Sequence, residues 1–212
     1  MKHLFEKIVH ELKEHLPFTF AASFVAVAMM AFFLIKTDLI SRAVTLFYIF
    51  HPAHIFFSSL VSAAILYKHN KKWWVSLFLG GIISIIVGTT SDVVFPYLGS
   101  LLFHIPISFH LPFLEHPSLI FGVMILGGAA GVAFKKTKVP HFLHVFISVL
   151  ASLLYIFSYS ADFSILAILF IFIITGLSVV IPCCLSDIVF PVLLGEKMHS
   201  HSHKIKWGKE DD

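Results

Sequence analysis

Apolar residues occur along this chain in long runs that short polar segments interrupt. A helix needs about 20 mostly apolar residues to cross the hydrocarbon core of a bilayer. Six runs come close enough to that length to predict transmembrane helices. They lie at about residues 17–35, 50–67, 73–92, 117–134, 140–158 and 162–182.

Two shorter segments complete the pattern. Residues 1–16 carry apolar side chains at helical spacing and predict an amphipathic helix lying on the membrane surface. Residues 39–49 predict a short interfacial or re-entrant helix before the second span. The expected divisions are the surface helix 1–16, a first membrane repeat 17–99, an outer loop 100–116, a second repeat 117–195 and a His/Lys-rich tail 196–212.

The composition agrees with a membrane protein. Hydrophobic residues make up 58% of the 212 residues and charged residues only 13%, whereas soluble domains carry about 25% charged residues. The mean hydropathy is +0.93. We therefore expect the lipid bilayer to be the main partner of this surface. The chain has no glycine-rich phosphate loop, His-Glu-x-x-His motif or basic aromatic groove, which argues against an ATPase, a zincin protease and nucleic-acid binding.

The basic residues predict an orientation. With six spans, only Lys36 and Arg42 of the 15 lysines and arginines fall on one side of the membrane. Cytoplasmic loops carry an excess of such residues. We therefore predict a protein integral to the cell (inner) membrane with both termini in the cytoplasm, so that the 100–116 loop faces outward.

Two motifs recur in the two halves of the chain. SDVVFP at 91–96 returns as SDIVFP at 186–191, and HPAHIFFSSLVS at 51–62 returns as HFLHVFISVLAS at 141–152 with six of twelve positions identical. Each half has three predicted spans, so the second copy must insert upside down, as in many secondary transporters. The predicted fold is thus an all-α integral membrane protein with six transmembrane helices, arranged as two inverted three-helix repeats after the surface helix.

The repeat also duplicates polar groups that can bind a metal. Histidines at positions i and i+3 share one face of a helix, and a carboxylate from a neighbouring helix can join them. The predicted outer site comprises His51, His54, Asp92, Glu115 and His116. The predicted inner site comprises His141, His144, Asp187, His15 and Cys184. Four serines on the same helices are expected to form interhelical hydrogen bonds or line a pathway: Ser58, Ser62, Ser148 and Ser152.

This donor set predicts a function. Two imidazoles and a carboxylate suit zinc, or iron and manganese with open positions, and a thiolate favours zinc or copper. We expect a carrier or channel for a divalent transition-metal ion, with zinc as the first candidate and manganese, iron or copper as others. Six helices make a small bundle for a pathway, so we also expect a homodimer.

Other interpretations fit the same residues. A membrane metalloenzyme could use a His/Asp site to activate water against a lipid, and a two-haem electron carrier could use the histidines as axial ligands. The histidines could also serve as proton relays or as interfacial polar residues. Ser91-Asp92 could simply cap a short helix.

Overall fold

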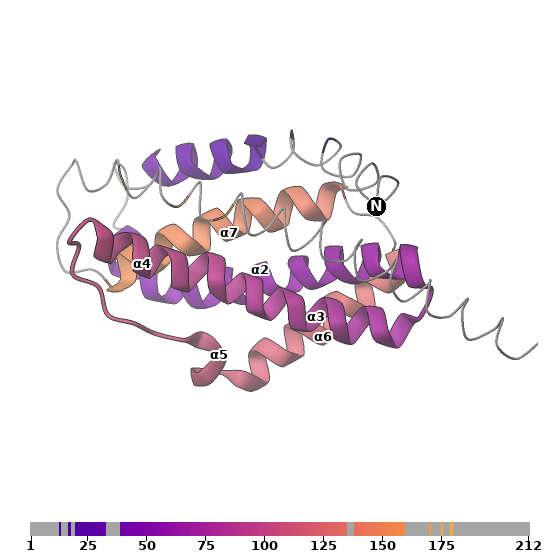
Figure 1. Ribbon diagram of the computed structural model, residues 1–212. Coiled ribbons are helices and arrows are strands. Elements are labelled where there is room, and N and C mark those ends of the chain that lie inside the picture. Colours follow the sequence, from indigo (N-terminus) through magenta and orange to yellow (C-terminus); the bar gives the residue numbers. More distant parts are fainter. Residues whose placement is uncertain are drawn as a thin grey trace, which may run out of the picture.

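The computed structural model describes residues 20–32, 39–134 and 138–159, together with Lys13, Pro17, Phe170, Thr175 and Val179. The side chains of residues 39–40, 69–70 and 138–141 lie outside this description. The described part is built from helices (Figure 1). They are a helix at Phe20–Phe32, α2 (Leu39–Asn70), α3 (Trp73–Thr89), the π-helical segment η1 (Thr90–Val94), α4 (Phe95–Leu102), α5 (Pro112–Glu115), α6 (Pro117–Phe134) and α7 (Lys138–Tyr159).

Four described helical stretches are long and apolar enough to cross a membrane. They are Ser41–Lys68, Trp73–Leu102, Pro117–Phe134 and Phe142–Tyr159. The predicted span 117–134 has the bounds of α6, and the predicted span 140–158 matches α7 closely. The first predicted span appears as the shorter apolar helix Phe20–Phe32. Most of the sixth, 162–182, lies outside the described residues.

Helix α2 runs through the middle of the described bundle. It packs against α3, α6 and α7, which run alongside it (Figure 1). A largely apolar core joins α2 and α7 to the helix Phe20–Phe32, which contributes Ala22, Ala26 and Met30. These small and flexible side chains allow that helix to lie close to its neighbours.

Glycines bring the backbones of α6 and α2 into contact. A Cβ atom added at Gly127 would lie 2.2 Å from the carbonyl oxygen of Phe56, and one at Gly131 would lie 2.1 Å from that of Leu60. No real side chain tolerates such distances. The Gly-x-x-x-Gly spacing therefore fixes the α2–α6 contact, as small residues do in membrane helix pairs.

The predicted short helix at 39–49 is wrong, because these residues form the first part of α2. Residues 39–51 contain no proline or glycine, so nothing in that stretch interrupts the helix. Pro52 lies inside α2. As a result, His54 lies thirteen residues after Ser41 and fourteen before Lys68 in the candidate span. The histidine pair therefore lies in the middle of its helix, not near the outer end as predicted.

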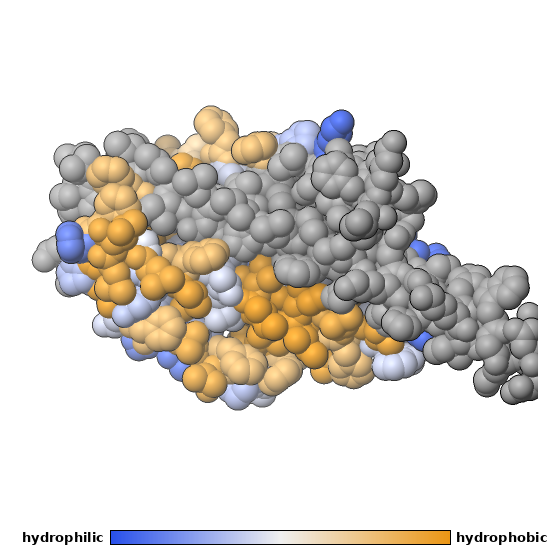
Figure 2. All heavy atoms as spheres, viewed as in Figure 1, coloured by the Kyte–Doolittle hydropathy of each residue, from blue (hydrophilic) through white to orange (hydrophobic). Residues whose placement is uncertain are grey.

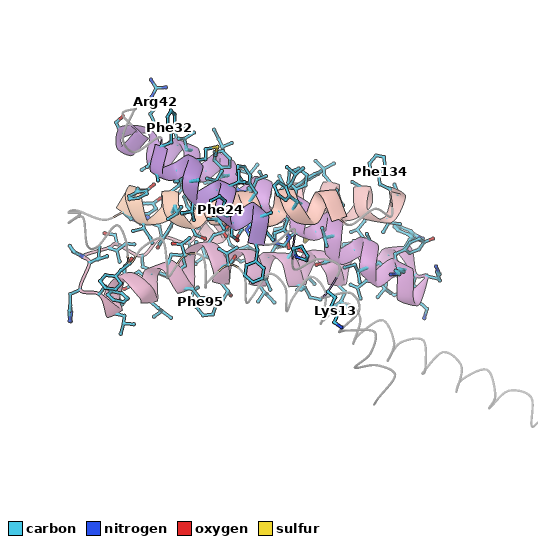
Figure 3. The ribbon with its side chains drawn as sticks, turned by 90° about the horizontal axis from the view of Figure 1, so that it is seen from above. Lys13, Phe24, Phe32, Arg42, Phe95 and Phe134 are labelled. Carbon is cyan, nitrogen blue, oxygen red and sulfur yellow. The ribbon has the colours of Figure 1, made fainter. Side chains whose placement is uncertain are left out.

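Large apolar side chains cover much of the outside of the bundle (Figure 2). Phe78, Ile82 and Ile86, at successive turns of α3, are each at least 50% exposed. Phe95 and Phe134 also project outward from their helices (Figure 3). Such a surface suits contact with lipid chains, whereas His51, His54 and Asp92 are fully buried within it.

Candidate functional site

The helix around Asp92 is distorted, and the sequence explains why. Residues Thr90–Val94 form a π-helical turn between α3 and α4, in which the Phe95 N–H donates to the carbonyl oxygen of Thr90. Pro96 follows Asp92 by four residues. It has no N–H to donate to the Asp92 carbonyl, and its ring crowds that oxygen. A widened turn relieves this clash, and π-helical turns are frequent at functional sites.

Asp92 holds the two histidines of α2 through a single carboxylate oxygen. Nδ1 of His51 lies 2.9 Å and Nδ1 of His54 lies 2.7 Å from Oδ2 of Asp92. All three side chains are fully buried. An ionised carboxylate can only accept hydrogen bonds, so both imidazoles carry their proton on Nδ1. In the neutral form, Nε2 of each ring then carries a lone pair that can accept a hydrogen bond or bind a cation.

The other carboxylate oxygen is held by serines. The hydroxyl groups of Ser91 and Ser148 donate to Oδ1 of Asp92 over 2.9 and 2.8 Å. Ser152 donates to the carbonyl oxygen of Ser91 over 3.1 Å. The predicted role of Ser148 and Ser152 in interhelical hydrogen bonds is confirmed, and these bonds fasten α7 to the π-helical turn.

The group formed by His51, His54 and Asp92 is called the central cluster below, and its residues lie at matching depths in two helices. His51 is ten residues from Ser41, and Asp92 is ten residues from Leu102, the respective ends of their candidate spans. At 1.5 Å per residue, both lie about 15 Å from those ends. The spans have 28 and 30 residues, so the cluster lies deep inside both of them.

A third histidine touches the central cluster. The rings of His54 and His144 have centroids 4.7 Å apart, and His144 is fully buried. Nε2 of His51 is also buried, and it has no hydrogen-bond partner among the described residues. Buried polar atoms are normally satisfied, so this nitrogen is a position where a water, a proton or a cation can bind.

Glu115 belongs to a different group, at one end of the bundle. It accepts a hydrogen bond from the Tyr48 hydroxyl, and its other oxygen lies 3.1 Å from Nδ1 of His110. The ring of His116 lies 5.3 Å from that of Tyr48. Partial burial raises the pKa of Glu115, but the hydrogen bonds from Tyr48 and His110 and the nearby histidines lower it by more. The pKa of Glu115 therefore lies below its usual value.

The predicted outer site is thus brought together in part. His51, His54 and Asp92 meet, as expected, whereas Glu115 forms its hydrogen bonds with Tyr48 and His110, outside the central cluster. His144, assigned to the inner site from the sequence, joins the central cluster through His54. The remaining residues of the predicted inner site lie outside the described residues or side chains: His15, His141, Cys184 and Asp187.

Sequence reasoning overlooked three aromatic residues near these groups. Phe47 stacks on His51 with ring centroids 5.5 Å apart, and Tyr48 and Tyr159 hold the Glu115 group. Phe47 and Tyr48 precede His51 by four and three residues, which places them one helical turn away. This spacing could have predicted their positions, but a helix break was assumed before residue 50.

The geometry of the central cluster is that of hydrogen bonds. In the part of the chain that the structure describes, no three His, Cys, Asp or Glu side chains are grouped so as to hold a metal ion. Ligands of tetrahedral zinc bound at 2.0–2.1 Å lie about 3.3 Å from each other. The nitrogen–oxygen distances of 2.7 and 2.9 Å are shorter, so direct binding of an ion would require the imidazoles to move by about half an ångström.

No protein-family model, curated protein or solved structure matches this chain.

Proposed function

We propose that this chain is a membrane transporter that exchanges a divalent transition-metal ion for protons at the central cluster. The observation that carries the proposal is the sharing of the Asp92 carboxylate by His51 and His54, all fully buried inside apolar helices. Ionisable groups within a membrane are costly, and they typically mark ion pathways and proton relays. The ion is the cargo, with zinc as the first candidate and manganese, iron or copper as others.

The protons on the imidazoles supply the coupling. Metal ligands must be deprotonated, so when both imidazoles start as imidazolium, binding of the ion at Nδ1 of His51 and His54 releases one proton from each ring. Two imidazolium groups and one carboxylate carry a single positive charge in total. One divalent ion with neutral imidazoles and the same carboxylate also carries a single positive charge. An exchange of two protons for one ion therefore leaves the buried charge unchanged.

We further propose that the whole protein has six transmembrane helices in two inverted repeats. Two observations on the described helices support this arrangement. Helices α2 and α7 run antiparallel, because His54 contacts His144 while Phe47, earlier in α2, contacts Tyr155, later in α7. His54 and His144 are also equivalent positions of the sequence repeat. Equivalent residues meet where a two-fold axis lies in the membrane plane.

In this arrangement a second cluster adjoins the first. The repeat pairs Asp187 with Asp92 and His141 with His51. The proposed inner site therefore contains His141, His144 and Asp187, with His15 and Cys184 as additional candidates, and the contact of His54 with His144 connects the two sites. We also propose that the protein forms a homodimer. It is inserted in the cell membrane with both termini in the cytoplasm.

Proton translocation alone is a second candidate function. The hydrogen-bonding geometry of the cluster favours it, because imidazole and carboxylate at 2.7–2.9 Å can pass a proton without moving. This candidate predicts proton movement that is independent of any metal ion.

Elemental analysis of the purified, tag-free protein tests metal binding. The common background replaces the three tail histidines His199, His201 and His203 by serine, because such a tract binds metals by itself. We expect about one or two bound ions per chain, depending on whether the inner site also fills, and loss of at least one in the variant His51→Ala/His54→Ala. The matched control is His104→Ala, which removes an exposed histidine outside the cluster. An equal metal content in all three proteins, or no metal after loading with zinc, manganese, iron and copper, would refute metal binding by the cluster.

A further inference from the structure

Aromatic residues lie between the central cluster and one end of the bundle. Phe47 is fully buried and stacks on His51. Its ring also contacts Tyr155 at 5.3 Å and Tyr159 at 6.2 Å between centroids. Both tyrosines belong to the last turns of α7, so Phe47 separates His51 from the end of the helix pair.

The connection between α4 and α6 closes over this aromatic group. The Ser108 N–H donates to the Tyr159 carbonyl oxygen over 3.2 Å. The His110 N–H donates to the Tyr155 hydroxyl over 3.1 Å, and that hydroxyl donates to the Ser108 carbonyl oxygen over 3.3 Å. The His110 ring stacks on the Tyr159 ring at 4.2 Å. This segment is therefore bound to the end of α7 by both backbone and side-chain contacts.

A second attachment joins the same connection to α2. Glu115 binds both the Tyr48 hydroxyl and His110, and the Tyr159 hydroxyl donates to that of Tyr48 over 3.4 Å. Tyr48 is the immediate neighbour of Phe47. The contacts that hold Tyr48 in place therefore also limit the movement of the backbone that carries Phe47.

We propose that Phe47 is the gate between the central cluster and the aqueous phase on the side of residues 103–116. The bonds from Tyr48 and His110 to Glu115 form the latch that holds it closed. This gate rests on the proposed transport function, in which the cluster must open to one side of the membrane at a time. An apolar ring at a constriction excludes hydrated ions, and breaking the polar latch outside the hydrocarbon region frees the ring to move.

Thiol labelling tests the gate without requiring transport. The background replaces Cys183 and Cys184 by alanine and introduces Ser148→Cys, which places the single thiol beside Asp92. The protein in lipid nanodiscs is treated with a small, charged methanethiosulfonate reagent. We expect slow labelling in this background, at least tenfold faster labelling with Phe47→Ala, and severalfold faster labelling with Tyr48→Phe or Glu115→Gln.

Ile49→Ala is the matched control. Ile49 lies two residues from Phe47 on α2, but it is 58% exposed on the outside. Its truncation should leave the labelling rate unchanged. A second reporter, Ser152→Cys, reports on the neighbouring buried position if the first variant fails to fold.

The outcomes separate the gate from the transport proposal. Labelling within twofold of the background in Phe47→Ala, or equal acceleration in Ile49→Ala, would overturn the gate, even if the wild-type protein carries metal ions. If Phe47→Ala is labelled faster but the wild-type protein transports no ion, the gate is retained and the transport function is overturned.

Discussion

The imidazole rings of His54 and His144 lie 4.7 Å apart in the buried centre of the bundle. The sequence placed these histidines on opposite sides of the membrane, because each begins a predicted span. In the structure, α2 extends well before His51, and its antiparallel neighbour α7 carries His144 alongside. The contact joins His144, one histidine of the predicted inner site, to the central cluster.

The hydrogen bond from Ser148 to Asp92 should contribute measurably to stability. Ser148→Ala leaves one carboxylate oxygen with a single donor, and hydrogen bonds to charged groups contribute about 1.5–3 kcal/mol. Ser158→Ala, in the same helix, removes only a bond to the Leu154 carbonyl oxygen of its own helix. We expect Ser148→Ala to lower the free energy of unfolding in detergent by about 2 kcal/mol. Equal stability of the two variants would contradict the assigned bond.

The contact between α6 and α2 predicts different effects of alanine at two glycines of α6. Gly127→Ala drives a methyl group into the Phe56 carbonyl oxygen, whereas a Cβ at Gly122 meets nothing within 4 Å. Overpacking typically costs about 1–3 kcal/mol, and alanine is favoured over glycine in a helix by about 1 kcal/mol. We therefore expect a lower melting temperature for Gly127→Ala, and an unchanged or higher one for Gly122→Ala. The reverse order would show that the helices pack differently.

His104 lies just after the end of α4 and has a strained backbone. Its φ is 55°, a left-handed conformation that glycine adopts more readily. The Ile105 N–H donates to the Ser100 carbonyl oxygen over 2.8 Å, which is the pattern of a Schellman cap. His104→Gly should stabilise the protein by about 1 kcal/mol. Thermal unfolding of His104→Gly should be compared with that of His104→Ala, which keeps a Cβ. An equal gain in stability in the alanine variant would argue against backbone strain.

The hydrogen bonds to Glu115 should make the stability of the protein depend on pH. Because the pKa of Glu115 is lowered in the folded protein, its contribution is present above the ordinary value of about 4.5 and is lost as the pH falls through the folded pKa. The wild type should melt at a higher temperature than Glu115→Gln at neutral pH, and the difference should shrink below about pH 4.5. A difference that stays constant across this range would mean that the charge of Glu115 does not stabilise the fold.

The apolar pattern predicts the helices of this protein better than it predicts their ends. The span at 117–134 was predicted with its observed bounds, because Pro117 begins the helix and Lys135 follows the apolar run. The second span was predicted too short, since a run of about 20 residues was taken as complete, whereas α2 has 32. Hydropathy does not distinguish a helix that extends beyond the hydrocarbon core from two consecutive elements.

The candidate site, too, was predicted only in part. His51, His54 and Asp92 were predicted to meet, because imidazoles and carboxylates in apolar runs need partners. Glu115 was predicted to join the same site, but it bonds to Tyr48, and nothing in the sequence indicates that the Tyr48 hydroxyl is its partner. The π-helical turn follows from Pro96 four residues after Asp92, and its recurrence at Pro191 and Asp187 predicts the same distortion in the second repeat.

Flux through reconstituted liposomes tests the exchange of a metal ion for protons at Asp92. The liposomes contain a metal-sensitive and a pH-sensitive dye, and zinc, manganese, iron or copper is added outside. We predict metal uptake with movement of about two protons per ion in the opposite direction. Asp92→Asn should abolish both fluxes, while Gly122→Ala keeps them. Uptake equal to that of protein-free liposomes for every ion, or undiminished uptake by Asp92→Asn, would contradict metal–proton exchange at Asp92.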